Sequence, residues 1–374
     1  MQIEQTTWTT EHGWNRPEPP GTPADLVLVF GGRRVLEDPD RLNELRQRYP
    51  AATLLGCSTA GEICGTRVLD DTLVATAVRF TTTRVAGAMV RIGHPSDSKA
   101  VGERLGSTFD SHNLKHVFVL SDGVGVNGSE LVRGLTASLP AHVTVTGGLS
   151  GDGSAFQKTV IVWNDEVSSG AVAALGFYGP DLHVGWGCLG GWDPFGPERL
   201  ITRSSGNVLF ELDGRSALGL YKQYLGEHAA GLPATGLLFP LSVRGQNGET
   251  GVVRTILSVN EADQSLTFAG DVPEGAYARL MKANFDRLVD GAVGAARTSR
   301  NGSPPELAVL ISCVGRKLIL KQRVEDEVDG VREALGASTV LTGFYSYGEI
   351  SPFSPHARCE LHNQTMTVTT FTER

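Results

Sequence analysis

The sequence lacks several features that would assign it to a familiar class of protein. Its cysteines number only five and are scattered, with no C-x-x-C pair, which argues against a disulfide framework and against a structural zinc site. No apolar segment is long enough to cross a bilayer, and residues 1–23 have no apolar core of a signal peptide. With 33 Lys and Arg against 41 Asp and Glu, the chain also lacks the basic excess of proteins that bind nucleic acid or membranes. We therefore expect a cytoplasmic protein that binds neither.

Motifs of common enzyme classes are missing as well. There is no G-x-x-x-x-G-K-[ST] segment for nucleotide phosphates, and neither Ser58 nor Ser150 lies in a G-x-S-x-G turn. Cys57 would need a histidine base to act as a nucleophile, and two short acidic turns at 121–123 and 151–153 do not make a metal site. We expect no catalytic residue, no metal and no enzyme activity, and a hydrolase-like enzyme is kept only as an alternative.

The sequence is rich in glycine, which often follows short apolar runs. There are 46 glycines among 374 residues, and 40% of the residues are hydrophobic. Glycine directly after an apolar run is typical of strand ends and tight loops. The length predicts two domains or one large duplicated unit, since domains usually have about 100–200 residues. The start of the chain, residues 1–23, ends in a Pro-rich stretch and is expected to be a flexible tail.

Three segments have the pattern of a strand, a helix and a second strand. They span residues 25–55, 116–146 and 306–341. Asp38, followed by proline at the first helical position, marks one helix start, and Ser129 is expected to cap the helix of the second segment.

The middle of the chain is rich in runs that are typical of antiparallel strands. A helix is expected at 278–296, and the chain is expected to end in a hairpin with its turn at 362–363. The sequence thus predicts an α/β to α+β fold with two lobes, mixed sheets, duplicated β-α-β units and antiparallel strands in the middle.

One motif, G-x-x-[ST]-x-G-E-I, occurs at residues 56–63 and again at 343–350. Each copy follows the second strand of a β-α-β segment, which indicates a duplicated structural unit. Its hydroxyls and carboxylate would face the strand ends, where open α/β sheets bind ligands, and the second segment offers similar groups. The simpler interpretation is that Glu62 and Glu349 accept backbone hydrogen bonds and hold tight turns. The predicted ligand-binding set is Ser58, Thr59, Glu62, Ser121, Asp122, Asn127, Ser150, Asp152, Tyr345, Ser346, Tyr347 and Glu349.

These motifs resemble the FIST family, a sensory domain of bacterial signalling proteins that also occurs with F-box domains in eukaryotes. The resemblance implies a FIST N-terminal domain at 24–218 and a FIST C domain at 219–374. The matching segments cover nearly the whole chain after the tail: 56–63, 120–123, 127–128, 147–153, 206–214, 220–226, 343–352 and 362–366.

The resemblance implies a sensory protein whose small ligand is an amino acid or a similar polar metabolite. Family members are often fused to histidine kinases, cyclases or chemotaxis modules. The FIST-like region here reaches the last residue, so we expect a signal passed to a separate partner such as a histidine kinase or cyclase. No cofactor is expected. The resemblance also implies an alternative, because one subgroup of stand-alone FIST proteins binds haem and senses nitric oxide for a partner kinase. For that alternative His183 is the first candidate axial ligand.

Overall fold

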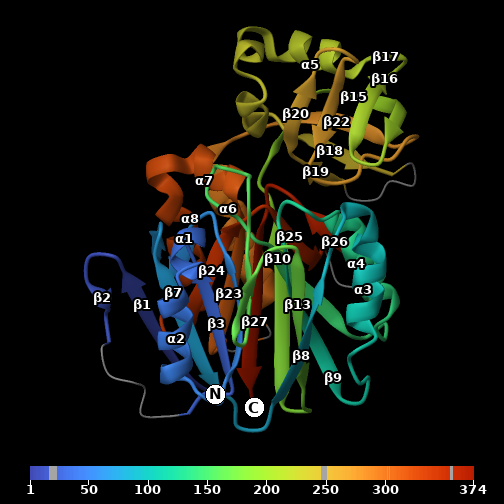
Figure 1. Ribbon diagram of the computed structural model, residues 1–374. Helices are drawn as coiled ribbons and strands as arrows, with labels where there is room; N and C mark the ends of the chain where they lie inside the picture. The colour runs from blue at the N-terminus through green and yellow to red at the C-terminus, as the bar shows by residue number, and fades with distance from the viewer. Residues whose placement is uncertain (17–22, 246–250, 301, 303, 354–356) are drawn as a thin grey trace.

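The protein consists of a body and a smaller lobe that stands on one end of it (Figure 1). The computed structural model describes residues 1–16, 23–245, 251–300, 302, 304–353 and 357–374. The body holds three sheets of seven, six and six strands, and the lobe holds an eight-stranded sheet. This architecture confirms the predicted α/β to α+β class with mixed sheets. No helix of the described residues is long and apolar enough to cross a membrane.

The body is built from three copies of one unit. Each unit has a first strand, two parallel strands joined by a helical crossover, a hairpin, and a last strand antiparallel to the parallel pair. The crossovers confirm the three predicted β-α-β segments, because β3 is parallel to β4, β9 to β10 and β23 to β24. The first strand of each pair contains an apolar run of at least four residues, as expected of strands buried on both faces.

The bounds of the elements follow the chain through the three units. The first unit contains β1 (Gln2–Thr9), β2 (Gly13–Trp14), β3 (Leu26–Gly31), α1 (Arg33–Leu36), α2 (Pro39–Arg48), β4 (Thr53–Ser58), β5 (Glu62–Cys64), β6 (Arg67–Leu69) and β7 (Leu73–Arg79). The second contains β8 (Arg84–Arg91), η1 (Pro95–Asp97), α3 (Ser98–Gly106), β9 (Leu114–Ser121), α4 (Gly128–Ala137), β10 (Thr144–Leu149), β11 (Ile161–Trp163), β12 (Glu166–Ser168) and β13 (Ala171–Tyr178). The third contains β14 (Leu182–Leu189), α6 (Phe285–Ser299), β23 (Leu307–Cys313), α7 (Val314–Leu320), η4 (Lys321–Arg323), α8 (Val324–Leu335), β24 (Val340–Ser346), β25 (Gly348–Pro352), β26 (Cys359–His362) and β27 (Met366–Glu373).

Each unit gives its hairpin to the sheet of a neighbouring unit. Strand β5 of the first unit pairs with β24, β11 of the second pairs with β4, and β25 of the third pairs with β10. The exchange therefore runs in a closed ring around the body. Three backbone hydrogen bonds repeat the same ring at the strand ends: Ala60 N to Tyr345 O at 2.8 Å, Gly151 N to Ser58 O at 2.8 Å and Tyr347 N to Leu149 O at 3.2 Å.

The repeated sequence motif lies at the same place in the first and third units of this threefold pattern. Gly56, Gly147 and Gly343 occupy equivalent positions, and a Cβ at each would lie 2.0, 1.8 and 1.8 Å from a carbonyl oxygen of the neighbouring parallel strand. Only glycine fits at such a close approach. The second unit thus carries a third, degenerate copy of the motif, which keeps the glycine and Ser150 but has no glutamate at the position of Glu62.

Four details differ from the sequence-based predictions. The expected flexible tail is wrong for its first part, because β1 pairs along most of its length with β7. Residues 17–22 lie outside the described residues. The expected helix at 278–296 begins only at Phe285, because β22 occupies Tyr277–Lys282 and Asn284 caps the helix. The strands around 362–363 are not a hairpin, because β26 pairs with β25 and β27 with β14 and β23. Asn127, not Ser129, caps α4 by accepting a hydrogen bond from Glu130 N at 3.1 Å.

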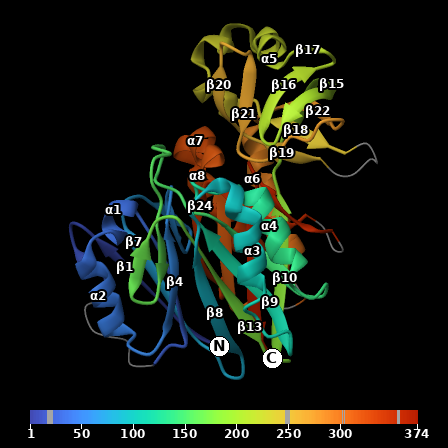
Figure 2. The same cartoon turned by 45° about the vertical axis from the view of Figure 1, so that its right-hand side comes forward.

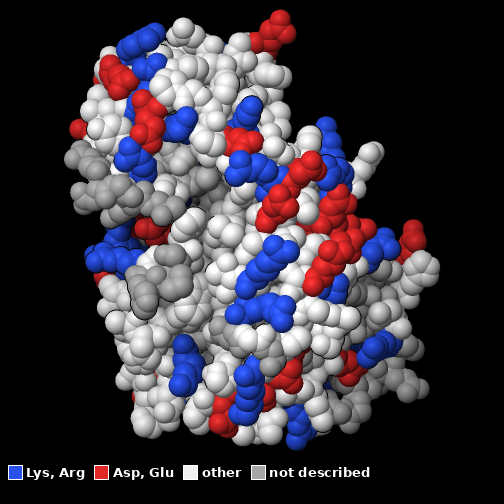
Figure 3. All heavy atoms as spheres, turned by 180° about the vertical axis from the view of Figure 1, so that it is seen from behind, with Lys and Arg blue, Asp and Glu red and all other residues white. Residues whose placement is uncertain are grey.

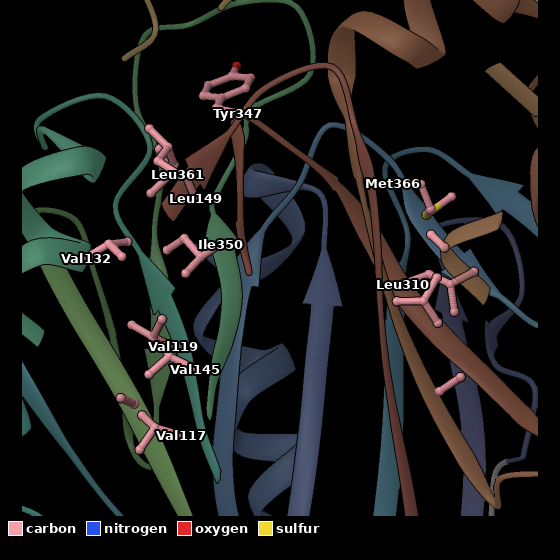
Figure 4. Close-up of a cluster of buried hydrophobic side chains, with 14 of the residues drawn as sticks. Val117, Val119, Val132, Val145, Leu149, Leu310, Tyr347, Ile350, Leu361 and Met366 are labelled. Atoms are coloured by element: carbon pink, nitrogen blue, oxygen red, sulfur yellow. The ribbon is translucent and has the colours of Figure 1, made fainter. Parts of the chain in front are cut away.

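The core of the body lies between its sheets and helices. Figure 4 shows Val117, Val119 and Val145 along β9 and β10, close to Ile350 of β25 and Val132 of α4. All of these side chains are at most 2% exposed. The exchanged strand β25 therefore contributes to the core of the unit that receives it.

The smaller lobe is inserted into the third unit between β14 and α6, and we call it the inserted lobe. It has its own apolar core, which includes Ile201, Leu209, Tyr221, Leu241 and Phe268. The predicted boundary at 218/219 falls inside its helix α5, so the division along the sequence is not the division in space. Its elements are β15 (Asp193–Ser205), β16 (Val208–Leu212), β17 (Arg215–Ser216), α5 (Ala217–Leu225), η2 (Gly226–Gly231), η3 (Ala234–Leu238), β18 (Leu241–Arg244), β19 (Val252–Arg254), β20 (Ile256–Asn260), β21 (Ser265–Phe268) and β22 (Tyr277–Lys282).

The two connections between the body and the inserted lobe lie side by side (Figure 2). Asp193, at the start of the lobe, accepts a hydrogen bond at 3.2 Å from Nδ2 of Asn284, which follows the last strand of the lobe. Asp193 also pairs with Arg287 of α6 in the body. Gly191 has a φ of 88°, and a Cβ there would lie 1.8 Å from the carbonyl oxygen of Arg287. The two connections are thus held together at one place, which we call the hinge.

Candidate functional site

Glu62 closes the loop that follows the first copy of the motif. Its side chain is buried, at 1% exposed. One carboxylate oxygen accepts a hydrogen bond from Thr59 Oγ1, and the other accepts from Thr72 N at 3.1 Å and Thr72 Oγ1 at 2.7 Å. Burial raises the pKa of Glu62 to about 7, against the opposing effect of these hydrogen bonds.

Glu349 makes the same contacts in the second copy. It accepts hydrogen bonds from Ser346 Oγ at 2.6 Å, Thr365 N at 3.1 Å and Thr365 Oγ1 at 2.8 Å. Burial raises its pKa to about 8. In both copies the glutamate therefore joins two loops of its own unit, which is the simpler of the two interpretations of the motif.

In the second unit Asp122 joins two loops of its own unit, as the glutamates do in the other two units, but from a different position in the sequence. One of its oxygens accepts from Thr159 Oγ1 at 3.0 Å and Gly170 N at 3.1 Å, and the other accepts from Val124 N at 2.9 Å and Gly125 N at 2.6 Å. Asp122 as a whole residue is 4% exposed. It holds the loop after β9 against the start of β13.

Ser346 and the other three predicted serines at these strand ends are fully buried. Ser58 Oγ accepts a hydrogen bond from Val160 N at 2.9 Å. Ser121 Oγ donates to Asp122 O at 3.1 Å, and Ser150 Oγ donates to Ser121 O at 2.8 Å. The hydroxyls of Ser58 and Ser150 thus bind the backbone of another segment, whereas that of Ser121 binds the carbonyl of the next residue.

Tyr345 belongs to a buried ionic network that sequence reasoning missed. Its hydroxyl donates to Glu327 at 2.7 Å, and Ser312 Oγ donates to the same oxygen at 2.9 Å. The other oxygen of Glu327 pairs with Arg316 at 2.7 Å, and both side chains of this pair are 0% exposed. No periodic pattern in the sequence marks these two charged residues as partners.

Tyr347 anchors the loop of residues 151–160, which only the second unit has between its parallel pair and its hairpin. The hydroxyl accepts hydrogen bonds from Asp152 N and Phe156 N, both at 3.1 Å, and donates to the Asp152 carboxylate. The ring of Phe156 stacks on Tyr347 with centroids 4.2 Å apart. Phe156 is 39% exposed, so this pair forms an apolar point on the surface.

Most of the predicted ligand-binding residues thus lie together at the strand ends, but their polar atoms bind other parts of the chain. Asn127 is the exception in position, because it lies at the border with the inserted lobe. Its Nδ2 donates to Asp271 of that lobe at 3.2 Å while its Oδ1 caps α4. Whether this set also binds a ligand stays a prediction.

A groove of about 940 Å³ lies between the body and the inserted lobe. The body contributes α4, the residues after it and β26, and the inserted lobe contributes β18 and β19. Figure 3 shows the two parts from behind, with charged side chains of both signs near their border. Residues that matter for its chemistry are Arg133, Trp186, Arg254, Asp271, Arg358 and Glu360.

Arg254 is the buried charge of this groove, at 6% exposed. Its Nη1 donates to Leu361 O in the body at 2.8 Å, and its Nε donates to Asp271 O in the inserted lobe at 3.0 Å. Arg133 reaches Asp271 from the body at 3.8 Å. Sequence reasoning missed Arg254, although a lone charge within the apolar run of residues 252–256 was a signal.

His183, the haem candidate, is exposed on β14, opposite Thr372 of β27. His183 does not line the interlobe groove, and its exposed position on a strand does not fit a haem ligand, which needs an apolar pocket. His116 and His362 are buried and hydrogen-bonded, and burial lowers their pKa to about 3 and about 4. No group of three metal-binding side chains occurs within the described part of the chain.

Comparisons with known proteins place this geometry in a family. The FIST N domain matches residues 25–215, and the FIST C domain matches residues 217–352. The chain is 22% identical over 299 residues to the uncharacterized protein MJ1623 of Methanocaldococcus jannaschii, which covers 74% of this chain and 57% of that protein. The chain thus spans little more than half the length of this relative.

A solved structure, a cyanuric acid hydrolase from A. caulinodans, aligns with 78% of this chain and 99% of its own at 11% identity. The TM-score of 0.19 is too low to carry any argument from that likeness. The two family matches adjoin inside the inserted lobe and together cover most of the chain. The chain therefore belongs to the FIST family, whose domains serve signal transduction as sensory, ligand-binding domains.

Proposed function

We propose that this protein is a cytoplasmic sensor without catalytic activity that binds a small polar metabolite, such as an amino acid, in the interlobe groove. The observation that carries the proposal is a groove between the body and an inserted lobe that has its own apolar core. Sites of this volume between two parts of a protein are typical of small-molecule binding. The groove is preferred over the strand ends because the polar side chains there already bind within the chain.

The contacts across the groove suggest how binding is communicated. Asn127 and Arg133 of the body both contact Asp271 of the inserted lobe, and Arg254 of the lobe donates to Leu361 O of the body. A ligand that contacts both walls binds more tightly to one position of the lobe than to another. That difference in binding free energy is what shifts the equilibrium between positions. A partner such as a histidine kinase or cyclase then distinguishes the two states.

The first experiment is a thermal-shift screen with the amino acids, followed by calorimetric titration of each ligand that raises the melting temperature. Ala137 is exposed on α4 and lines the groove, so Ala137→Trp fills it without disturbing the core. Ala51 is exposed and does not line the groove, so Ala51→Trp is the matched control. We expect Ala137→Trp to abolish binding and Ala51→Trp to leave it unchanged. Equal affinity in both variants would place the ligand elsewhere.

The signalling part of the proposal is tested separately. The partner kinase or cyclase is titrated against the protein with and without saturating ligand. Ligand is expected to change the affinity for the partner by about 5-fold or more, the usual lower end of allosteric coupling. An unchanged affinity means that binding and signalling are not linked.

A further inference from the structure

Among the described residues two arginines are buried, and they differ in what neutralises their charge. Arg316 is 0% exposed and forms an ion pair with the equally buried Glu327 at 2.7 Å. Arg254 is 6% exposed, and within the described residues no carboxylate lies within ion-pair distance of it. Its recorded partners are the carbonyl oxygens of Leu361 and Asp271, which carry only partial charges.

A buried guanidinium without a carboxylate is an expensive arrangement. Transfer of a charge out of water is unfavourable unless an opposite charge or several hydrogen bonds compensate for it. The effect is visible in the pKa of Arg254, which burial lowers, whereas the carboxylates of Glu360 and Asp271 at longer range oppose the shift. Arginine nevertheless stays charged in proteins, so the positive charge persists at the wall of the groove.

The remaining charges of the groove do not cancel that of Arg254. Arg244 is neutralised by Glu198, which it contacts at 2.7 and 2.6 Å. Arg133 and Arg358 add positive charge to the rim, and Asp271 and Glu360 supply the negative charge. Asp271 is shared with Arg133 and Asn127, so it is already engaged across the border of the two parts.

We propose that Arg254 is the anchor for an anionic group of the ligand, a carboxylate or a phosphate, so that the groove selects small organic anions. The inference rests on the proposed function and deepens it. A guanidinium carries five N–H donors in a planar fork, and the two recorded bonds leave donors for a bidentate contact with an oxyanion. The anion supplies the charge that Glu327 supplies to Arg316. Because Arg254 also joins the inserted lobe to β26, the anchored anion acts on the contact between the two parts.

The test measures binding of sodium succinate, sodium glutamate and sodium phosphate by calorimetry, with choline chloride as the cationic control and with ionic strength held constant. The wild-type protein is expected to bind at least one anion saturably and to show no binding of choline. Arg254→Gln is expected to weaken anion binding by about 10-fold or more, as the loss of one charge-assisted contact predicts. Arg203→Gln, outside the groove and already paired with Glu211, is expected to stay within about 2-fold of wild type. Phosphate binding without carboxylate binding assigns the ligand to phosphates, and the reverse assigns it to carboxylates.

A second variant keeps the test informative if Arg254→Gln does not fold. Glu360 is exposed and forms no ion pair among the described residues, and its charge acts directly on Arg254. Glu360→Gln removes a like charge from the approach of an anion, so it is expected to tighten anion binding by about 2- to 5-fold. An anion affinity that is unchanged in a folded Arg254→Gln variant would overturn the assignment of Arg254. If Arg254→Gln does not fold, an anion affinity unchanged in Glu360→Gln would overturn it. Binding of only neutral ligands, abolished by Ala137→Trp, also overturns it but preserves the proposed function. If ligands of no charge type bind, both proposals fail.

Discussion

The buried pair of Arg316 and Glu327 makes a sharp prediction about stability. Arg316→Met removes the cation and leaves Glu327 without a counter-charge at a position that is 0% exposed. Breaking a buried ion pair on one side costs about 3–5 kcal/mol. The carbonyl oxygens of Gly190 and Leu288, which accept from Arg316 at 2.5 and 2.7 Å, also lose their donor. The expected loss is therefore about 4 kcal/mol or more, a large part of the stability of a typical domain.

The double variant separates loss of charge from loss of packing. Glu327→Gln keeps an acceptor for Tyr345 and Ser312, which donate at 2.7 and 2.9 Å, but carries no charge. In the Arg316→Met background it should therefore restore about 1–3 kcal/mol, because no uncompensated charge is left. The assay is urea unfolding followed by far-UV circular dichroism for the wild type, both single variants and the double variant. Strictly additive losses, or an Arg316→Met variant within about 1 kcal/mol of wild type, would refute the reasoning.

Three further predictions follow from the hinge and the strand ends. Gly191→Ala should lower the melting temperature clearly more than the control Gly214→Ala, because both glycines have a positive φ but only Gly191 faces a carbonyl oxygen at 1.8 Å. Scanning calorimetry decides this, and equal shifts would contradict it. The pKa of Glu349 is raised from 4.5 to about 8, so the folded state binds more protons than the unfolded state in that range and its stability falls as pH rises from about 4.5 to 8. Glu349→Gln should flatten that part of the pH–stability curve, and an unchanged slope would exclude Glu349 as its source. Tyr347→Ala should leave ligand affinity within about 2-fold if the groove is the site, whereas a large loss would return the site to the strand ends.

The sequence predicted local structure well where the pattern was local. The three β-α-β segments and the start of α2 at Asp38 followed from apolar runs and capping residues. The repeated motif could be recognised because glycine is required at both Gly56 and Gly343, where a neighbouring carbonyl oxygen leaves no room for Cβ. The third copy was hidden, because Gly147 keeps the glycine while the loop after it is longer and lacks the glutamate.

Long-range pairing was beyond the sequence patterns. Nothing local distinguishes a hairpin that stays in its own sheet from β25, which leaves for the sheet of β10. The same limit explains the wrong hairpin at the chain end, since strands near in sequence joined different sheets. The charged residues of the groove, Arg254 and Asp271, also follow no helix or strand periodicity in the sequence. Arg254 and Asp271 meet at the groove only because the inserted lobe folds back over β26.

The closed exchange of hairpins has a consequence for how such a protein changes over evolutionary time. Because every unit completes the sheet of another, a single unit cannot be deleted, duplicated or recombined without leaving an open strand edge in its neighbour. The body is therefore inherited as an indivisible whole. The adjoining ends at Gly191 and Asn284 are different, because a segment that starts and finishes at one point can be exchanged without disturbing the ring. Diversity among such proteins is then expected to accumulate in the inserted lobe, while the ring beneath it stays constant.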